Sequence, residues 1–193
     1  MIRRLYDWTI DQAAKPYAER MLAVVSFIES SVFPIPPDVL LIPMIIAERL
    51  KAFRFALICT IASVLGGIAG YAIGVFLFDQ VGQPILEFLG HGEKFAVFRV
   101  RYEEWGVWVV LFAGLTPFPF KVITILSGAV ALDIRVFIFS SIAARGLRFF
   151  MEAGLLWYFG EPIRNFIEKY LGWVTAVCLV LLIGGFILAK YLI

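Results

Sequence analysis

The sequence predicts an all-α integral membrane protein. It would contain two inverted repeats, each a re-entrant helical hairpin followed by a transmembrane helix, together with interfacial amphipathic helices and a C-terminal transmembrane helix. Three observations lead to this class. Of the 193 residues, 62% are hydrophobic and 17% are charged, with a mean hydropathy of +0.91, which exceeds the usual apolar content of soluble domains. Two long apolar runs are interrupted by prolines, and the same order of parts occurs in both halves of the chain.

Length and charge exclude several classes of function. A chain of 193 residues suits a single membrane domain, and a net charge of +2 is too small to indicate a nucleic-acid partner. With two cysteines in apolar runs and a single histidine, His91, we expect no metal site, no redox chemistry and no cofactor. The N-terminus lacks the apolar core and cleavage site of a signal peptide, so we expect the chain to keep its whole length.

Residues 1–20 mix arginines and lysines with aromatic and aliphatic side chains. That mixture is typical of a short helix in the headgroup layer of a membrane. A solvated tail is the alternative.

The first broken segment covers residues 21–47. Its centre contains three prolines, namely Pro34, Pro36 and Pro37. Neither flank reaches the roughly 20 apolar residues that a spanning helix needs, so we predict a re-entrant hairpin with Glu29 and Asp38 near its tip. A single kinked span over residues 21–47 is the alternative.

Residues 55–78 contain no charge and are long enough to span a bilayer. Within this stretch a small residue recurs at every fourth position, at Ala62, Gly66, Gly70 and Gly74. One helix face therefore lacks side chains, and we interpret it as a packing seam without chemistry of its own.

Residues 79–106 form the longest polar stretch. Aromatic residues from Phe95 to Trp105 recur at helical spacing, which predicts an amphipathic helix along an interface. His91 lies between two glycines in an expected turn, where a solvated position is the plain interpretation and a pH-dependent role stays open.

The second broken segment covers residues 107–132 and contains Pro117, Pro119 and Lys121. Each proline removes a backbone donor and disfavours the α conformation at the residue before it, so this run must break. Broken backbone at membrane depth has to be buried in protein or line a wet cavity, and an ionisable group there suggests a pathway for an ion or a polar headgroup.

Residues 136–160 form the next apolar stretch, and Arg145, Arg148 and Glu152 lie within it on one side of a helix. They form either an ion-pair lock between helices or part of a polar pathway. Because two arginines face one glutamate, one cation is left for another partner. A final run over residues 173–189 is just long enough to span.

An internal repeat joins these parts. Pro34-Ile35-Pro36 matches Pro117-Phe118-Pro119, and Gly82-Gln83-Pro84-Ile85 matches Gly160-Glu161-Pro162-Ile163. We therefore assign residues 1–20 to an interfacial helix, 21–106 to the first repeat, 107–170 to the second repeat and 171–193 to the C-terminal span. A hairpin plus one span crosses the membrane an odd number of times, so the second copy is inverted, as in secondary transporters.

Lysines and arginines predict the orientation. The side that holds residues 1–20 and 48–54 carries nine of them against five on the other side. This bias predicts that the N-terminus lies inside the cell, in the cytoplasm, and the C-terminus outside.

Glu29 with its proline elbow, the glycine-rich span and the stretch from Gly114 to Lys121 together resemble the DedA family, also called SNARE-associated or VTT-domain membrane proteins. The second elbow is most similar to the YqaA-like branch. The resemblance covers residues 25–165. It implies two facing re-entrant hairpins and lipid transport, as a flippase or scramblase for undecaprenyl phosphate or phospholipids, with coupling to protons. It also implies a location in the inner membrane of a bacterial cell. Members of the family carry an arginine near the position of Thr116, so headgroup binding would shift toward Lys121.

The expected mechanism uses two sets of residues. Lys121, Arg145 and Arg148, with Thr116, would bind the phosphate of an anionic lipid. Glu29, Asp38 and Glu152 would balance these cations in the empty site and couple transport to protons. The sequence contains no nucleophile with a base close to it and no set of metal ligands, so we do not expect an enzyme.

Two other functions remain open from the sequence. The same residues could serve a proton-coupled exchanger of small ions. Alternatively, the glycine ladder could be the interface of a non-transporting structural or chaperone partner of other membrane proteins. A homodimer is compatible with all three interpretations.

Overall fold

The computed structural model describes residues 17–32, 36–84, 92–116 and 119–160, which are helical and contain no strand. The elements are α2 (Ala18–Ser31), α3 (Asp38–Ala47), η1 (Arg49–Lys51), α4 (Ala52–Leu77), the π-helical η2 (Phe78–Gly82), α6 (Gly92–Leu115), α7 (Phe120–Ala129) and a helix over residues 134–160. The all-α prediction is therefore confirmed. The expected N-terminal helix, the C-terminal span and His91, Pro34 and Pro117 lie outside the described residues.

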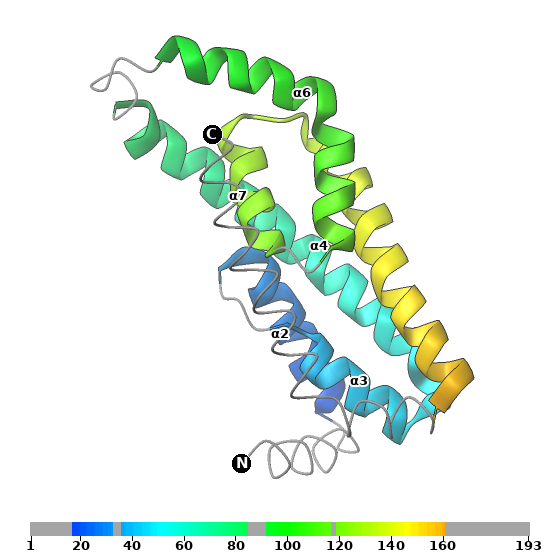
Figure 1. Cartoon of the computed structure of the whole chain (residues 1–193). Coiled ribbons are helices and arrows are strands. Elements are labelled where there is room, and N and C mark those ends of the chain that lie inside the picture. The colour runs from blue at the N-terminus through cyan, green and yellow to red at the C-terminus, as the bar shows by residue number, and fades with distance from the viewer. Residues whose placement is uncertain (1–16, 33–35, 85–91, 117–118, 161–193) are drawn as a thin grey trace, which may run out of the picture.

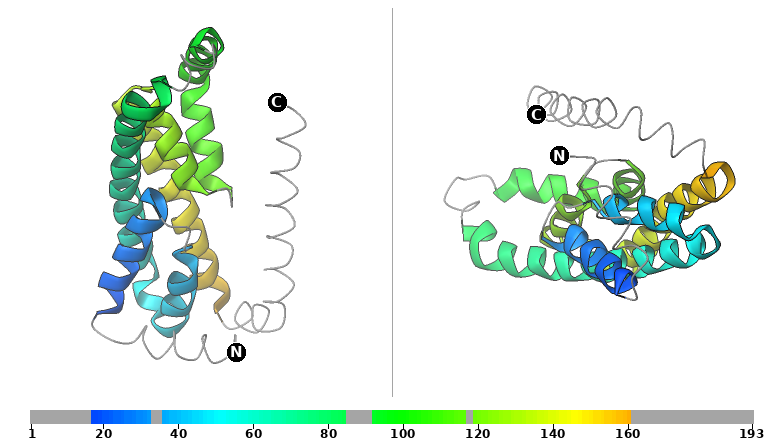
Figure 2. Two further views of the ribbon diagram at one scale, coloured as in Figure 1. Left: turned by 90° about the vertical axis from the view of Figure 1, so that its left-hand side faces the viewer. Right: turned by 90° about the horizontal axis from the view of Figure 1, so that it is seen from below.

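The first broken segment is a helical hairpin. Helix α2 ends at Ser31, and α3 begins at Asp38 with Pro37 as its N-cap residue at φ −65°. The two helices run in opposite directions (Figures 1 and 2). Leu22 near the start of α2 shares an apolar cluster with Met44 near the end of α3. The break at the prolines is thus as predicted, and the single kinked helix is not what forms.

The second broken segment also forms a hairpin, between the C-terminal part of α6 and α7. Pro119, in extended backbone at ψ 105°, caps the start of α7. Val110 and Ala113 of α6 pack with Phe120 and Ile123 of α7 in a second apolar cluster. One detail differs from the prediction, because the amphipathic segment and the first arm of this hairpin are a single helix, so the boundary between residues 106 and 107 falls inside α6.

Two long helices accompany the hairpins. Helix α4 with its flanks, Arg49–Gln80, is the one helix among the described residues that is long and apolar enough to cross a membrane. The helix over residues 134–160 begins after Asp133, whose carboxylate accepts hydrogen bonds from the backbone N–H groups of Arg135 and Val136 at 2.8 and 3.2 Å. This carboxylate is a regular N-cap.

The two hairpins approach each other from opposite ends of the molecule, and their tips meet about halfway along α4 (Figures 1 and 2). The glycine seam of α4, formed by Gly66, Gly70 and Gly74, makes this possible. A Cβ at Gly66 would overlap the backbone of Phe27 in α2, and one at Gly74 would overlap the backbone of Ile125 in α7. The predicted packing seam is confirmed, and it holds both hairpins.

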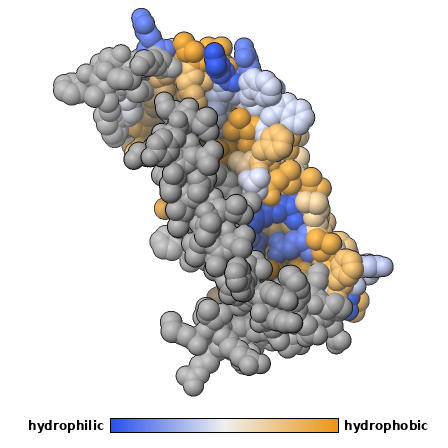
Figure 3. Space-filling view, viewed as in Figure 1, coloured by the Kyte–Doolittle hydropathy of each residue, from blue (hydrophilic) through white to orange (hydrophobic). Residues whose placement is uncertain are grey.

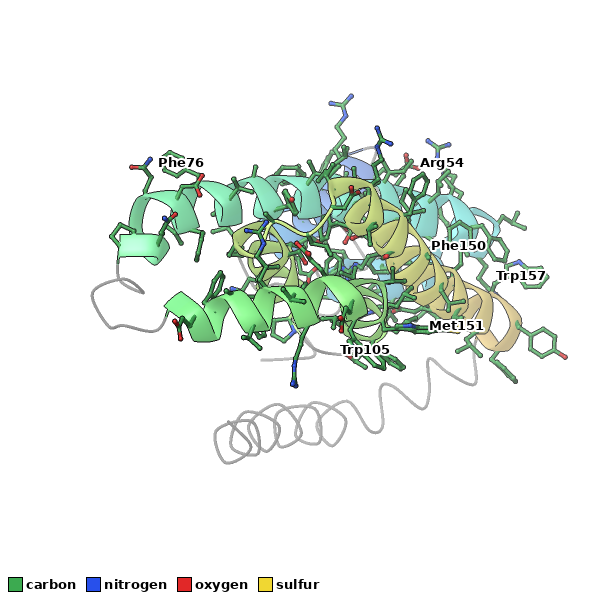
Figure 4. The ribbon with its side chains drawn as sticks, turned by 90° about the horizontal axis from the view of Figure 1, so that it is seen from above. Arg54, Phe76, Trp105, Phe150, Met151 and Trp157 are labelled. Atoms are coloured by element: carbon green, nitrogen blue, oxygen red, sulfur yellow. The ribbon has the colours of Figure 1, made fainter. Side chains whose placement is uncertain are left out.

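Apolar side chains cover the outside. Trp105 of α6 and Met151 and Trp157 of the helix over residues 134–160 lie at the periphery (Figure 4), and they are 63%, 50% and 46% exposed. Exposed aromatic and aliphatic residues also occur along α4 and α7. Contiguous apolar surface of this kind is unusual for a protein that faces water on all sides.

Candidate functional site

A buried ion pair joins the first hairpin to the helix over residues 134–160. Arg145 Nη2 donates to Glu29 Oε2 at 2.6 Å, and the Arg145 side chain is only 1% exposed. Glu29 lies in the last turn of α2, whereas Arg145 lies near the middle of the long helix. A charge this deeply buried is tolerated only when it is paired and hydrogen-bonded.

Two serines complete the surroundings of this ion pair. Arg145 Nε donates to Ser63 Oγ of α4 at 2.6 Å, and Ser63 shares a hydrogen bond with Ser30 Oγ at 2.6 Å. Ser30 Oγ also lies 3.0 Å from Glu29 Oε2. The resulting ring of hydrogen bonds links α2, α4 and the long helix through one guanidinium group.

Aromatic rings enclose the same guanidinium group. Its central carbon lies 4.9 Å from the ring centroid of Phe120 and 4.7 Å from that of Phe149. Cation–π contacts in a desolvated site stabilise a cation that cannot reach water. Phe120 is the first residue of α7, so Arg145 contacts both hairpins.

A second, more accessible ion pair lies beside the first. Arg148 Nη2 donates to Asp38 Oδ2 at 2.6 Å, and the two side chains are 22% and 24% exposed. Arg148 Nη1 donates to the backbone carbonyl of Thr116 at 3.3 Å. Arg148 therefore joins the start of α3 in the first hairpin to the end of α6 in the second.

Glu152 follows Arg148 by one helical turn in the helix over residues 134–160, and its side chain is partly buried. Asp38 Oδ1 is buried and accepts no hydrogen bond from any described residue.

The hairpin tips also contact each other directly. Lys121 Nζ donates to the backbone carbonyl of Val32 at 3.1 Å, and the Thr124 hydroxyl is 3.0 Å from the carbonyl of Ser30. Both acceptors lie at the C-terminal end of α2, where carbonyl groups lack intrahelical partners. Two residues of the second hairpin thus cap the helix end of the first.

We call Glu29, Asp38, Lys121, Arg145, Arg148 and Glu152 the charged cluster. It contains three acidic and three basic side chains, so it is neutral when all are ionised. In Figure 3 a hydrophilic patch lies about halfway along the molecule and is bordered by hydrophobic surface on both sides. Arg145 is the buried member of the cluster, and the side chains of the other five are partly exposed.

Arg145 Nη1 is a further buried donor that no described residue accepts from. Together with Asp38 Oδ1, it leaves one donor and one acceptor unused inside the charged cluster. Buried polar atoms are satisfied in the great majority of native structures, and exceptions concentrate at functional sites. Both atoms are closed off from solvent in this structure.

The structure brings the predicted site residues together from four separate stretches of sequence. Thr116 takes part through its carbonyl oxygen and not through its side chain. Ser63 and Thr124 were missed, and so were the rings of Phe120 and Phe149. Ser63 could have been noticed, since it lies seven residues before Gly70 and so carries a hydroxyl on the glycine seam.

The opposite charges of the cluster compensate one another through the pairs Glu29–Arg145 and Asp38–Arg148. Among the described residues no group of three or more histidine, cysteine or acidic side chains is arranged to hold a metal ion. The fold and the site define a class: all-helical proteins in which two opposed hairpins meet over paired, buried charges.

Comparison with known proteins identifies the relatives of the chain. A protein of Haemophilus influenzae named only as uncharacterized is 39% identical over 180 residues, which cover 92% of this chain and 93% of the relative. A homologue from Histophilus somni, also uncharacterized, is 35% identical over 177 residues, covering 90% and 92%. The chain belongs to the family of these two proteins. No model of a known protein family and no solved structure matches it.

Proposed function

We propose that the protein is a membrane transporter that moves an anionic lipid, such as undecaprenyl phosphate or a phospholipid, across the bilayer. The observation that carries this proposal is the position of the charged cluster. Glu29–Arg145 and Asp38–Arg148 lie where two hairpin tips meet, midway along a molecule with an apolar exterior. Ionisable groups at membrane depth mark pathways for polar cargo.

The arrangement of helices supports the same proposal. Each hairpin is followed by a long helix, and the two units are arranged in opposite directions. In an inverted repeat the substrate site lies at the interface of the two halves, where broken helices end. The resemblance to the DedA family, carried by Glu29 with its elbow and by the second elbow, supports the assignment.

The proposed cycle follows from charge. In the closed state Glu29 and Asp38 neutralise Arg145 and Arg148. When the tips part, Lys121 and Arg148 meet the phosphate first, and the unused Nη1 of Arg145 is available for one of its oxygens. The lipid tail stays among acyl chains while the headgroup crosses within protein.

We propose that proton coupling uses the carboxyl groups of Glu29, Asp38 and Glu152. With one proton on this set, the charged cluster carries a net charge of +1 and complements a monoanion. Loss of the proton on the other side restores neutrality and releases the anion. We therefore propose that the proton and the anionic lipid move in the same direction.

Vesicles test the proposal. The full-length protein is reconstituted in phosphatidylcholine vesicles that contain fluorescent phosphatidylglycerol, and translocation is measured by quenching of the outer leaflet. We expect Arg148→Gln to lower the rate roughly tenfold or more, because a charged hydrogen bond to the headgroup is lost. The matched control is Arg99→Gln, which removes an exposed arginine outside the cluster and leaves the rate unchanged.

The same vesicles separate lipid transport from the alternatives. A pH gradient that is acidic on the donor side should speed translocation by the wild type but not by Glu152→Gln. A wild-type protein that leaves lipid exchange at the protein-free rate refutes the proposal. If it then carries a soluble ion against a pH gradient, the ion exchanger is the correct function.

A further inference from the structure

An apolar groove runs along one face of α6 and ends beside the charged cluster. It is lined by Trp105, Trp108, Val109, Phe112, Ala113 and Thr116 of α6 together with Ile123 of α7. Its volume is about 520 Å³. This lies within the roughly 300–1,000 Å³ that small-molecule sites occupy.

Three aromatic side chains form the walls of the groove. Trp105, Trp108 and Phe112 follow one another at spacings of three and four residues, so they share a face of α6. All three are more than half exposed, and Trp108 and Phe112 have their ring centroids 6.3 Å apart. Trp105 points outward from α6 in Figure 4. The groove is therefore open at the surface of the molecule.

Thr116 connects the groove to the charged cluster. Thr116 is one of the residues that line the groove, at the C-terminal end of α6. Its backbone carbonyl oxygen accepts the hydrogen bond from Arg148. Arg148 is about one-fifth exposed, so a ligand at this end can reach a cation. Apolar walls that lead to an accessible guanidinium group match an amphiphile with an anionic head.

We propose that the groove seats one hydrocarbon chain of an anionic lipid while Arg148 contacts its headgroup. This inference rests on the proposed function and states which part of the lipid the groove binds and which part Arg148 binds. Within a bilayer, apolar contact with protein offers little hydrophobic gain over contact with other lipids. The chain is therefore held by fit between aromatic rings, and the charge at the Thr116 end selects which lipid occupies the groove.

Photolabelling tests the inference on the full-length protein. The probe is phosphatidylglycerol with a diazirine on one acyl chain, in phosphatidylcholine vesicles, and mass spectrometry locates the labelled residues. We expect the label to concentrate within residues 105–116. Phosphatidylcholine with the same diazirine should label this segment severalfold less, and Arg148→Gln should reduce phosphatidylglycerol labelling to that level.

Surface variants provide the matched control. Trp108→Ala combined with Phe112→Ala should lower labelling of the segment severalfold, because the walls of the groove are removed. Phe139→Ala changes an equally exposed aromatic residue on the helix over residues 134–160 and should have no effect. Label spread evenly over the exposed apolar surface overturns the inference, as does a groove occupied by another segment of the same chain.

Each of the two proposals can be refuted without refuting the other. If the groove is labelled but the wild type moves no lipid, the groove stands and the transport function is refuted. If the wild type translocates phosphatidylglycerol while the groove stays unlabelled, the transport function stands, and the proposal that the groove binds a lipid hydrocarbon chain is refuted.

Discussion

Arg145 connects several helices in the interior of the molecule. It reaches Glu29 in α2, Ser63 in α4 and the ring of Phe120 in α7 from one position on the helix over residues 134–160. Its side chain is almost fully buried. At low dielectric an ion pair interacts strongly, but each partner also loses its hydration, so removing one partner costs more than removing both.

We predict that Glu29→Gln destabilises the protein by about 3–5 kcal/mol, because it leaves the Arg145 charge buried without a counter-ion. Combining it with Arg145→Gln should recover part of the loss. The measurement is the apparent unfolding temperature of the purified protein in detergent.

The exposed pair Arg99–Glu103 supplies the control for this prediction. Its atoms are 3.4 Å apart, and both side chains are about half exposed. Glu103→Gln should change stability by no more than about 0.5 kcal/mol, as is usual for surface pairs. Equal effects of Glu29→Gln and Glu103→Gln would show that Arg145 reaches water or another anion.

At the scale of elements, α4 acts as the support on which both hairpins are mounted. Its glycines allow α2 and α7 to approach until backbone contacts backbone, and Gly70 lies where Ser30 of one hairpin and Thr124 of the other come together. Gly128 of α7 contributes to the same contact, since a Cβ at this position would overlap the backbone of Tyr71 in α4. Close approach of this kind is the main source of helix association in membranes.

We predict that Gly66→Ala destabilises the protein by about 1–3 kcal/mol, because the new Cβ would overlap the Phe27 carbonyl and force α2 away. Gly154→Ala is the matched control, since nothing lies within 4 Å of its Cβ position. This variant should stabilise the helix by about 0.5–1 kcal/mol. Thermal unfolding of both variants measures the difference, and a Gly66→Ala protein as stable as Gly154→Ala would mean that α2 does not rest on this seam.

At the scale of the whole molecule, the charges and the apolar surface predict how it sits in a membrane. The link η1 and the link at residues 130–133 lie at opposite ends of the molecule (Figure 1). Leu50 in η1 is 97% exposed and is flanked by Arg49 and Lys51. Because basic residues are in excess near this end, we predict that it faces the cytoplasm.

Cysteine labelling tests this topology. In a Cys178→Ser background, whole cells are treated with a maleimide that does not cross membranes. We expect Ala131→Cys to be labelled from outside, and Leu50→Cys only after the cells are opened. Cys59 does not interfere because it is buried. The reverse pattern would invert the orientation, and equal labelling of both sites in intact cells would exclude a spanning arrangement.

The sequence by itself determined the class of secondary structure, the two breaks and the identity of all six charged residues in the cluster. Prolines stop helices through local backbone geometry, and apolar runs and glycine spacing are local patterns, so no neighbour in space is needed to interpret them. Glu29, Asp38, Arg145, Arg148 and Glu152 stood out because charge is costly in apolar surroundings wherever it occurs.

Only the tertiary structure decided which acid meets which base. Glu29 and Arg145 are 116 residues apart in the sequence. Their pairing depends on how the glycine seam of α4 positions the two hairpins against the helix over residues 134–160. Spacing along the helix favoured a contact between Arg148 and Glu152, whereas Arg148 pairs with Asp38 across the hairpin. Helical periodicity fixes the face on which a side chain lies, but its partner depends on helix packing, which involves the whole fold.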